Sequence, residues 1–232
     1  LLDYDQPLLK KLMEDAPGPH THSVKVGTLA ESCANAIGAR ALLCRVGSYY
    51  HDIGKIKKPE YYAENQIGIN KHDSITPHMS AKILKQHVTD GLSLADEYGL
   101  PNIVKDFIET HHARNRMEFF YNKALEADKN VDENEFRYPG PKPRSKETGI
   151  VMLAEAIEAQ ANSLKNPTLE KFESMIDIAI RSRLEDGQLD ECPLTMEDLQ
   201  KIKGRRDGKH GLLPVLSGLY HSRPEYPSKD NE

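Results

Sequence analysis

The sequence predicts an all-α protein that forms a single domain. Along most of the 232 residues, apolar side chains recur at intervals of three and four, which is the spacing of one face of a helix. Residues that favour helix starts and stops stand at the ends of these runs, and no segment has the alternating pattern of a strand. A chain of this length can bury one large core, so a second domain is not required.

Five helices are expected in the first half of the chain. Their first residues lie near Pro7, His22, Leu42, Pro77 and Pro101. Glycine, or a run of proline and glycine, marks the end of four of them, at Ala16-Pro17-Gly18-Pro19, Gly38, Gly54 and Asp90-Gly91. The third helix then carries His51 and Asp52 in its last turn, and the fifth carries His111 on its apolar face.

Residues 127–146 predict a long irregular loop, because they are first acidic, then rich in proline, and show no periodicity. Helices return over 146–164 and 167–184, the second with Asn166 as N-cap, and Thr195 with Asp198 fits a capping box. We therefore expect one domain over 1–232. It divides into an N-terminal helix (1–16), a core that holds the candidate site (20–164) and a C-terminal helical region (165–232).

Composition excludes several classes of function. The chain has 31 Lys and Arg against 36 Asp and Glu, a net charge of −5, so it lacks the basic field that binds long nucleic acids. Its three cysteines, Cys33, Cys44 and Cys192, contain no C-x-x-C pair, which disfavours a disulfide framework and a thiolate zinc site and favours a reducing compartment. No apolar run reaches the roughly 18 residues that span a bilayer, and we expect the chain itself to be soluble.

Histidines are the most informative residues. Five of the ten fall where a helix would aim them inward or end at a pocket: His22, His51, His87, His111 and His112. One histidine on an apolar face is usually a hydrogen-bonded core residue, but the doublets His51-Asp52 and His111-His112 both stand at helix ends. Imidazole nitrogens and carboxylate oxygens together suit Mn, Fe or Zn, and a carboxylate can bridge two ions. The pattern predicts a site for two metal ions.

These residues carry a family resemblance. His22, the run His51-Asp52-Ile53-Gly54-Lys55 and a distant acidic residue resemble the HD superfamily of metal-dependent phosphohydrolases. From about Leu1 to Pro227 the chain is similar to the cytoplasmic domain of the seven-transmembrane HD-domain cyclic-di-AMP phosphodiesterases. The matching motifs are Glu64-Asn65-Gln66, Asn70 with His72-Asp73, His87-Val88-Thr89-Asp90-Gly91, His111-His112, Tyr138-Pro139-Gly140-Pro141-Lys142-Pro143 and Leu219-Tyr220-His221-Ser222-Arg223.

The resemblance implies an HD-domain helical bundle with a dinuclear metal site and a ligand set for each ion. The first ion takes His22, His51, Asp52 and Glu155, and the second takes His87, His111 and His112 with Asp52 as the bridge. The ions are expected to be Mn or Fe, with Zn or Co also compatible. Glu155 is a departure, because the family usually has Asp there, and Glu158, one turn on, is expected to support a ligand from behind.

The implied activity is hydrolysis of cyclic-di-AMP to linear 5′-pApA by hydroxide that two metal ions activate. Asp52 and Lys55 would be the catalytic residues, with Lys55 contacting the phosphate. The partner is then a small cyclic dinucleotide, and the choice of adenine comes from the resemblance alone. Attachment to the cytoplasmic face of a membrane would come only through segments absent from this chain, and the oligomeric state stays open.

The remaining basic residues and histidines are weaker candidates. Arg114, Arg116, Lys142, Arg144 and Lys146 could contact phosphate or base. His20, His72-Asp73, His78, His210 and His221 fit loop, surface or packing roles better than metal ligation.

Two other functions are compatible with the motifs. An HD nucleotidase or dNTP phosphohydrolase needs only one metal ion, and the additional histidines His87, His111 and His112 argue against it. A non-catalytic domain that senses a nucleotide is favoured only by the departure at Glu155.

Overall fold

The structure is a computed structural model that describes residues 1–3, 5–66 and 68–220, and in these ranges it confirms the all-α prediction. Apart from one isolated bridge between Arg116 and Arg137, every regular element there is a helix. The α-helices are α1 (Pro7–Asp15), α2 (Pro17–Ile37), α3 (Ala41–Tyr50), α4 (Pro77–Glu97), α5 (Asn102–Thr110), α6 (Glu118–Ala127), α7 (Lys146–Ser163), α8 (Leu169–Glu185), α9 (Met196–Lys203) and α10 (Leu212–Leu219). Short 3₁₀ helices are η1 (Ile53–Lys57), η2 (Pro59–Tyr61), η3 (Ala63–Asn65), η4 (Lys71–Ser74) and η5 (Glu133–Phe136).

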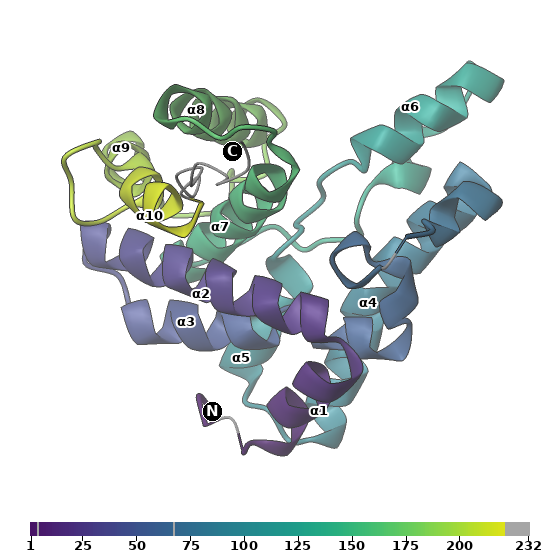
Figure 1. Ribbon diagram of the computed structural model, residues 1–232, viewed down its shortest axis with the longest axis horizontal. Coiled ribbons are helices and arrows are strands. Elements are labelled where there is room, and N and C mark those ends of the chain that lie inside the picture. Colours follow the sequence, from purple (N-terminus) through teal and green to yellow (C-terminus); the bar gives the residue numbers. More distant parts are fainter. Residues whose placement is uncertain (4, 67, 221–232) are drawn as a thin grey trace, which may run out of the picture.

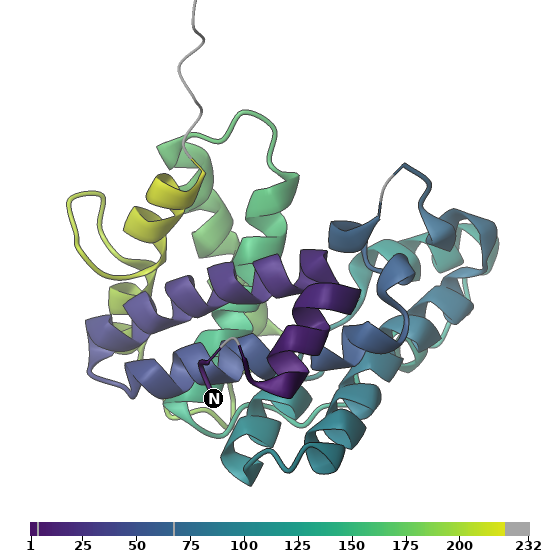
Figure 2. The same ribbon diagram turned by 60° about the horizontal axis from the view of Figure 1, so that its bottom comes forward.

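Helix α7 lies at the centre of the bundle. Its residues 150–154 are all completely buried, so the helix is apolar on every side and not only along one stripe. It packs against α2, α3, α5 and α8. Helices α8 to α10 lie at one end of the molecule and α4 with α6 at the other (Figures 1 and 2). The middle of α7 therefore lies between these two ends of the molecule.

Helix α2 starts earlier than the sequence indicated. We expected Pro17-Gly18-Pro19 to be a loop before a helix near His22, but Pro17 occupies the first turn of α2, where its missing N–H costs nothing. Gly18 fits there because a Cβ would lie 2.1 Å from the carbonyl oxygen of Glu64. As a result His22 lies in the second turn of a helix, and His20 lies in the helix and not in a loop.

Helix α4 continues beyond Asp90-Gly91, which we expected to end it, and runs to Glu97. Gly91 serves close packing instead. A Cβ on Gly54, in η1, would lie 1.8 Å from the carbonyl oxygen of His87 and 2.5 Å from the backbone nitrogen of Gly91. The two glycines therefore let η1 contact the backbone of α4, and this contact brings Asp52 to His87.

The segment 127–146 is the irregular loop that the sequence predicts, apart from η5 and the ends of α6 and α7. The amide of Met117 donates to the Phe136 carbonyl at 2.8 Å, and the amide of Tyr138 donates to the Asn115 carbonyl at 3.0 Å. Phe136 is fully buried against α4 and α6. Helix α6 was not expected from the sequence. The loop is thus fixed along the segment that follows His112.

Over residues 165–220 the C-terminal region is helical as expected, but the N-cap of α8 differs from the predicted one. Thr168, and not Asn166, caps α8 by accepting from the amide of Lys171, while Asn166 adopts a positive φ of 51°. The capping box of Thr195 and Asp198 is confirmed, and a second one forms between Ser145 and Thr148 at the start of α7. In the described ranges no helix is both long and apolar enough to cross a membrane.

Replacement of Gly54 by alanine tests the contact between η1 and α4. We expect Gly54→Ala to lower the free energy of unfolding by about 1–3 kcal/mol or more, because its Cβ meets backbone atoms that cannot move aside. Denaturant titration followed by circular dichroism measures the change. The control is Gly218→Ala in α10, where nothing lies within 4 Å of an added Cβ. This control should be neutral or up to about 1 kcal/mol more stable, and equal destabilisation by both substitutions would contradict the packing argument.

Candidate metal centre

Two groups of potential metal ligands meet at one residue. In each group the ligand atoms lie within 4.8 Å of one another, and the groups are His22, His51, Asp52 and Glu155, and Asp52, His87, His111 and His112. All seven residues are buried except His112, which is partly exposed. The structure therefore brings together every residue that we predicted as a ligand and divides them as predicted.

Helix ends place several of these side chains. We expected His51 and Asp52 in the last turn of one helix, but α3 ends at Tyr50, with His51 as its C-cap and Asp52 as the N-cap of η1. His111 is the C-cap of α5. Ala113, directly after His112, takes a positive φ of 47°, which ends α5 and turns the chain toward the loop. His87, His22 and Glu155 come from α4, α2 and α7. The centre thus joins five helices.

The two oxygens of Asp52 face different groups. Oδ2 lies 3.2 Å from His51 Nε2 and 3.7 Å from His22 Nε2, whereas Oδ1 lies 3.5 Å from His87 Nε2 and 3.6 Å from His111 Nε2. Both oxygens are buried. Oδ1 has no hydrogen-bond partner, and Oδ2 has an ion pair with Lys55 Nζ at 2.7 Å. A buried carboxylate with so few partners fits an oxygen pair that coordinates ions. The donors present therefore fit two divalent metal ions bridged by Asp52.

Three of the histidines are oriented by their own helices. Nδ1 of His51 lies 2.6 Å from the Ser48 carbonyl, Nδ1 of His87 lies 2.5 Å from that of Leu84, and Nδ1 of His111 lies 2.8 Å from that of Ile108. Each partner is three residues earlier. When Nδ1 donates to this carbonyl, Nε2 keeps its lone pair and faces Asp52, as a metal ligand requires.

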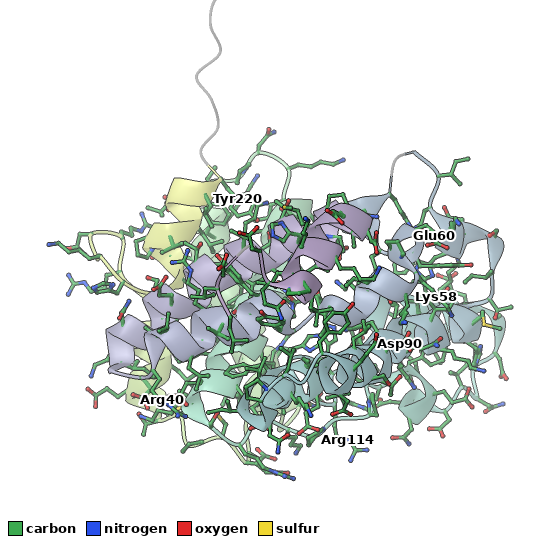
Figure 3. The ribbon with its side chains drawn as sticks, turned by 90° about the horizontal axis from the view of Figure 1, so that it is seen from below. Arg40, Lys58, Glu60, Asp90, Arg114 and Tyr220 are labelled. Carbon is green, nitrogen blue, oxygen red and sulfur yellow. The ribbon has the colours of Figure 1, made fainter. Side chains whose placement is uncertain are left out.

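His22 is held differently, by a carboxylate. Its Nδ1 lies 2.5 Å from Glu158 Oε2, and its Nε2 lies 2.5 Å from Glu155 Oε2. The other oxygen of Glu158 accepts from the Asn162 amide at 2.7 Å and from the Tyr220 hydroxyl at 2.8 Å. Figure 3 shows Tyr220 at the end of α10. Asn162 of α7 and Tyr220 at the end of α10 thus hold Glu158 against His22, and Glu158 lies where we predicted a supporting residue.

The two groups differ in their affinity for protons. Burial lowers the pKa of His87 to about 4 and that of His111 to about 3, so both are neutral at pH 7. Burial also opposes the charge of His51 and of His22, but nearby carboxylates outweigh it. Asp52 raises the pKa of His51 to about 9, and Glu155 raises that of His22 well above its usual value. Burial likewise opposes the charge on Asp52, yet His51 and Lys55 hold its pKa well below the ordinary range.

Comparison with known proteins agrees with this geometry. The HD domain family matches residues 20–160, which contain all seven candidate ligands. The chain belongs to the HD-domain family. The cyclic-di-AMP phosphodiesterase PgpH of Bacillus subtilis (strain 168) is 43% identical over 224 residues, covering 96% of this chain and 31% of the relative. PgpH of Listeria monocytogenes serotype 1/2a (strain 10403S) is 41% identical over 228 residues, covering 98% of this chain and 31% of the relative. The chain therefore spans about a third of the length of these curated relatives.

Solved structures of the same domain are also similar. The HD domain of L. monocytogenes PgpH in complex with cyclic-di-AMP has a TM-score of 0.89 and 41% identity, covering 94% of this chain and all of that one. A second structure of that HD domain has a TM-score of 0.87 at the same identity and coverage. The fold of this HD domain is thus that of the PgpH domain.

Lys55 lies next to Asp52, whereas the weaker basic candidates do not contact the ligand groups. Lys55 is buried in this HD domain and also donates to Glu64 at 2.6 Å. The other basic candidates lie outside both groups, and most contact surface carboxylates: Arg116 with Glu118 and Glu133, Lys142 with Asp190, Arg144 with Glu191, and Lys146 with Asp198. Arg114 is exposed at the molecule's edge (Figure 3).

Of the histidines that we set aside, none belongs to either ligand group in the described ranges. His72 is buried, with Nε2 2.8 Å from the Tyr61 carbonyl, so it orders its loop as expected. His78 is half exposed and lies 3.5 Å from Glu135. His20 and His210 also lie outside the groups, and His221 falls outside the described residues.

Two aromatic residues near the centre were missed as functional candidates. The ring of Tyr138 stacks on His112 with centroids 4.0 Å apart, and the edge of Tyr62 meets His87 with centroids 5.9 Å apart. Tyr138 lies in the loop whose motif we noted, but its position beside His112 depends on the pairing of that loop with residues 115–117. A cavity of about 740 Å³ is lined by residues that include His22, Lys55, Glu155 and Glu158.

The pKa values predict that the two groups bind metal with different pH dependence. Metal must displace the proton of His51, whose pKa is raised to about 9, so affinity at the first group should rise by about tenfold per pH unit from pH 6.5 to about 9. The raised pKa of His22 adds to this rise. His87 and His111 have already lost their protons at pH 6.5, so affinity at the second group should stay nearly constant. Mn²⁺ titration of the wild type and of Glu155→Ala, in which the first group is weakened, separates the two. A steep rise in Glu155→Ala would contradict this assignment.

Glu158 gives a second test of the centre. We expect Glu158→Ala to weaken Mn²⁺ binding at the first group by about 10- to 100-fold, because His22 loses the partner that fixes its ring. Glu158→Gln keeps a hydrogen-bond acceptor without the charge and should fall between Ala and wild type. The control is Glu126→Gln, exposed on α6. If binding at the first group is the same in all of these variants, Glu158 does not position His22.

Proposed function

We propose that this domain is a metal-dependent phosphodiesterase that hydrolyses cyclic-di-AMP to linear 5′-pApA. The main support for the proposal is that the two carboxylate oxygens of Asp52 face different groups of histidines. Hydrolysis of a phosphodiester is the reaction that two bridged ions favour. The PgpH relatives, and the PgpH domain in complex with cyclic-di-AMP, support the choice of substrate.

The roles of the residues follow from their positions. Two divalent ions, when bound, would supply an acidified water as nucleophile and would neutralise charge on the phosphate. His22, His51 and Glu155 would hold the first ion, His87, His111 and His112 the second, and Asp52 both. Lys55 keeps Asp52 ionised, and its ammonium group can also contact a phosphate oxygen of the substrate. Mn or Fe suits this mixture of nitrogen and oxygen ligands, and Zn or Co is also compatible.

The adenine bases need apolar flat surfaces near the centre. Tyr138 and Tyr62 offer such rings beside His112 and His87, and stacking of a base on an aromatic ring is favourable by about 1–3 kcal/mol.

A nucleotidase would require only the first group, and the four donors of the second group favour a diesterase instead. The position of Glu155 favours a catalytic domain over a non-catalytic domain that senses a nucleotide, because its carboxylate reaches both His22 and His51.

We further propose that residues 1–232 act as one domain. The main hydrophobic core joins the C-terminal helices to α2, α3 and α7, which supports this arrangement. By analogy with the family that the sequence resembles, the domain would work at the cytoplasmic face of a membrane within a longer protein. Its partner would be a small cyclic dinucleotide and not a long nucleic acid.

Asp52→Ala tests the proposed function. With Mn²⁺ supplied, the wild type should convert cyclic-di-AMP to the linear dinucleotide and leave single-stranded DNA uncut. The variant should lose activity by more than about 100-fold, since even partners behind a ligand are worth 10- to 100-fold. Product chromatography, metal analysis and circular dichroism are measured together. The control is Asp73→Ala, at the exposed residue of the second His-Asp doublet, which should keep full activity. A single ion per chain at saturation, or an active Asp52→Ala, would refute the two-metal proposal.

A further inference from the structure

The Lys55 ammonium lies between two carboxylates. Its Nζ is 2.7 Å from Asp52 Oδ2 and 2.6 Å from Glu64 Oε1. It also lies over the ring of Tyr62, 5.0 Å from the ring centroid. In the described ranges no other carboxylate forms an ion pair with Lys55, and of the two only Glu64 stands outside both ligand groups.

The backbone of Glu64 is fixed on the first turn of α2. An added Cβ on Gly18 would lie 2.1 Å from the Glu64 carbonyl oxygen, so only glycine allows this approach. The Gly18 amide also donates to Asn65 Oδ1 at 3.1 Å. These contacts involve the motif Glu64-Asn65-Gln66 that we noted in the sequence. They fix the segment from which the Glu64 side chain reaches Lys55.

The pair of Lys55 and Glu64 also forms part of a cavity wall. Both residues line the cavity of about 740 Å³ whose lining includes the candidate ligands His22 and Glu155. The side chain of Glu64 is 27% exposed and that of Lys55 only 9%. The Lys55 ammonium therefore lies between the cavity and Asp52, and Glu64 lies on its more exposed side.

Metal ions bound to Asp52 would change the surroundings of Lys55. The two oxygens of Asp52 face different groups of ligands, so an ion in each group would draw on both oxygens. An ammonium group in contact with the same carboxylate is repelled by these cations. Lys55 then needs a carboxylate that binds no ion, and Glu64 is the one within reach.

We propose that Glu64 is a positioning residue, which serves as the counter-ion of Lys55 when Asp52 binds metal ions and so keeps the Lys55 ammonium at the cavity wall. This inference rests on the proposed function. Without the charge of Glu64, repulsion by the ions would move Lys55 away from Asp52. Glu64 thus acts on the reaction through Lys55 and touches neither the ions nor the substrate.

The reactivity of Lys55 toward an acetylating ester reports its position independently of catalysis. Acetylation is followed by peptide mass spectrometry with and without Mn²⁺, and the exposed Lys57 is the internal reference. With Mn²⁺, we expect Glu64→Gln to raise the rate at Lys55 by about 10-fold, the lower end of the range for a lost charged hydrogen bond, because Glu64 is partly exposed. Without Mn²⁺ the rate should stay near that of the wild type, since Asp52 still holds Lys55.

Kinetics with cyclic-di-AMP and Mn²⁺ test whether Glu64 acts through Lys55. Glu64→Gln should lower kcat/KM by about 10-fold, and Glu64→Asp, which restores the charge, should recover part of this loss. In a Lys55→Met background, Glu64→Gln should cause no further loss, because the residue through which it acts is absent. The control is Glu60→Gln in the neighbouring η2 (Figure 3), an exposed carboxylate 3.5 Å from Lys71, which should match the wild type in both measurements.

Three results would refute the role of Glu64 and leave the proposed function standing. They are an unchanged acetylation rate at Lys55 in Glu64→Gln with Mn²⁺, an equal increase without Mn²⁺, and a further loss of kcat/KM in the Lys55→Met background. Circular dichroism of each variant checks that a loss is not one of folding. If the wild type does not cleave cyclic-di-AMP, the proposed function itself is wrong, whereas the acetylation rates still decide whether Glu64 holds Lys55.

Discussion

The burial of the Asp52 carboxylate is the constraint on which the centre depends. A charge without hydrogen bonds in the interior is strongly unfavourable unless opposite charges surround it. Here the surroundings come from α2, α3, α4 and α5 and from Lys55. Each of these elements must therefore be in place before Asp52 can be buried, so metal binding at this centre would be coupled to folding.

The burial of Asp52 also requires that the backbone of η1 pack closely on α4. Gly54 directly contacts the carbonyl of His87 and the amide of Gly91. No larger residue allows η1 to come so near, and a greater separation would move Asp52 away from His87 and His111. Gly54 is thus required because η1 lies so close to the backbone of α4, and not only because the chain turns there.

Much of the centre could be predicted because its signals are local. The doublets His51-Asp52 and His111-His112 stand at helix ends, where a free carbonyl three residues earlier can orient the ring. Where the sequence misled, a tertiary contact decided the outcome. Pro17-Gly18-Pro19 became a helix start because Gly18 packs against Glu64, and Asp90-Gly91 stayed helical because Gly91 packs against Gly54.

Residues that act through distant contacts left no local signal. Tyr62 stands in a segment whose sequence is that of an ordinary loop. Tyr138 is part of a noted motif, but only the pairing of residues 115–117 with 136–138 places its ring on His112. These positions depend on how separate segments meet, and helical periodicity carries no such information.

The departure at Glu155 becomes understandable when the two groups are compared. The first group contains Asp52 and Glu155, with Glu158 behind His22, so its attraction for a cation is largely that of carboxylates. The second offers three histidines and one oxygen of Asp52, and burial lowers the pKa of all three histidines. Carboxylate oxygens favour Mn²⁺ and similar hard ions, whereas imidazole nitrogens favour Zn²⁺ and Fe²⁺. The additional methylene of Glu155 lets its carboxylate reach both His22 and His51 from the central helix α7. The first group therefore retains its acidic character with Glu, and the two halves of the centre differ chemically even though they share Asp52.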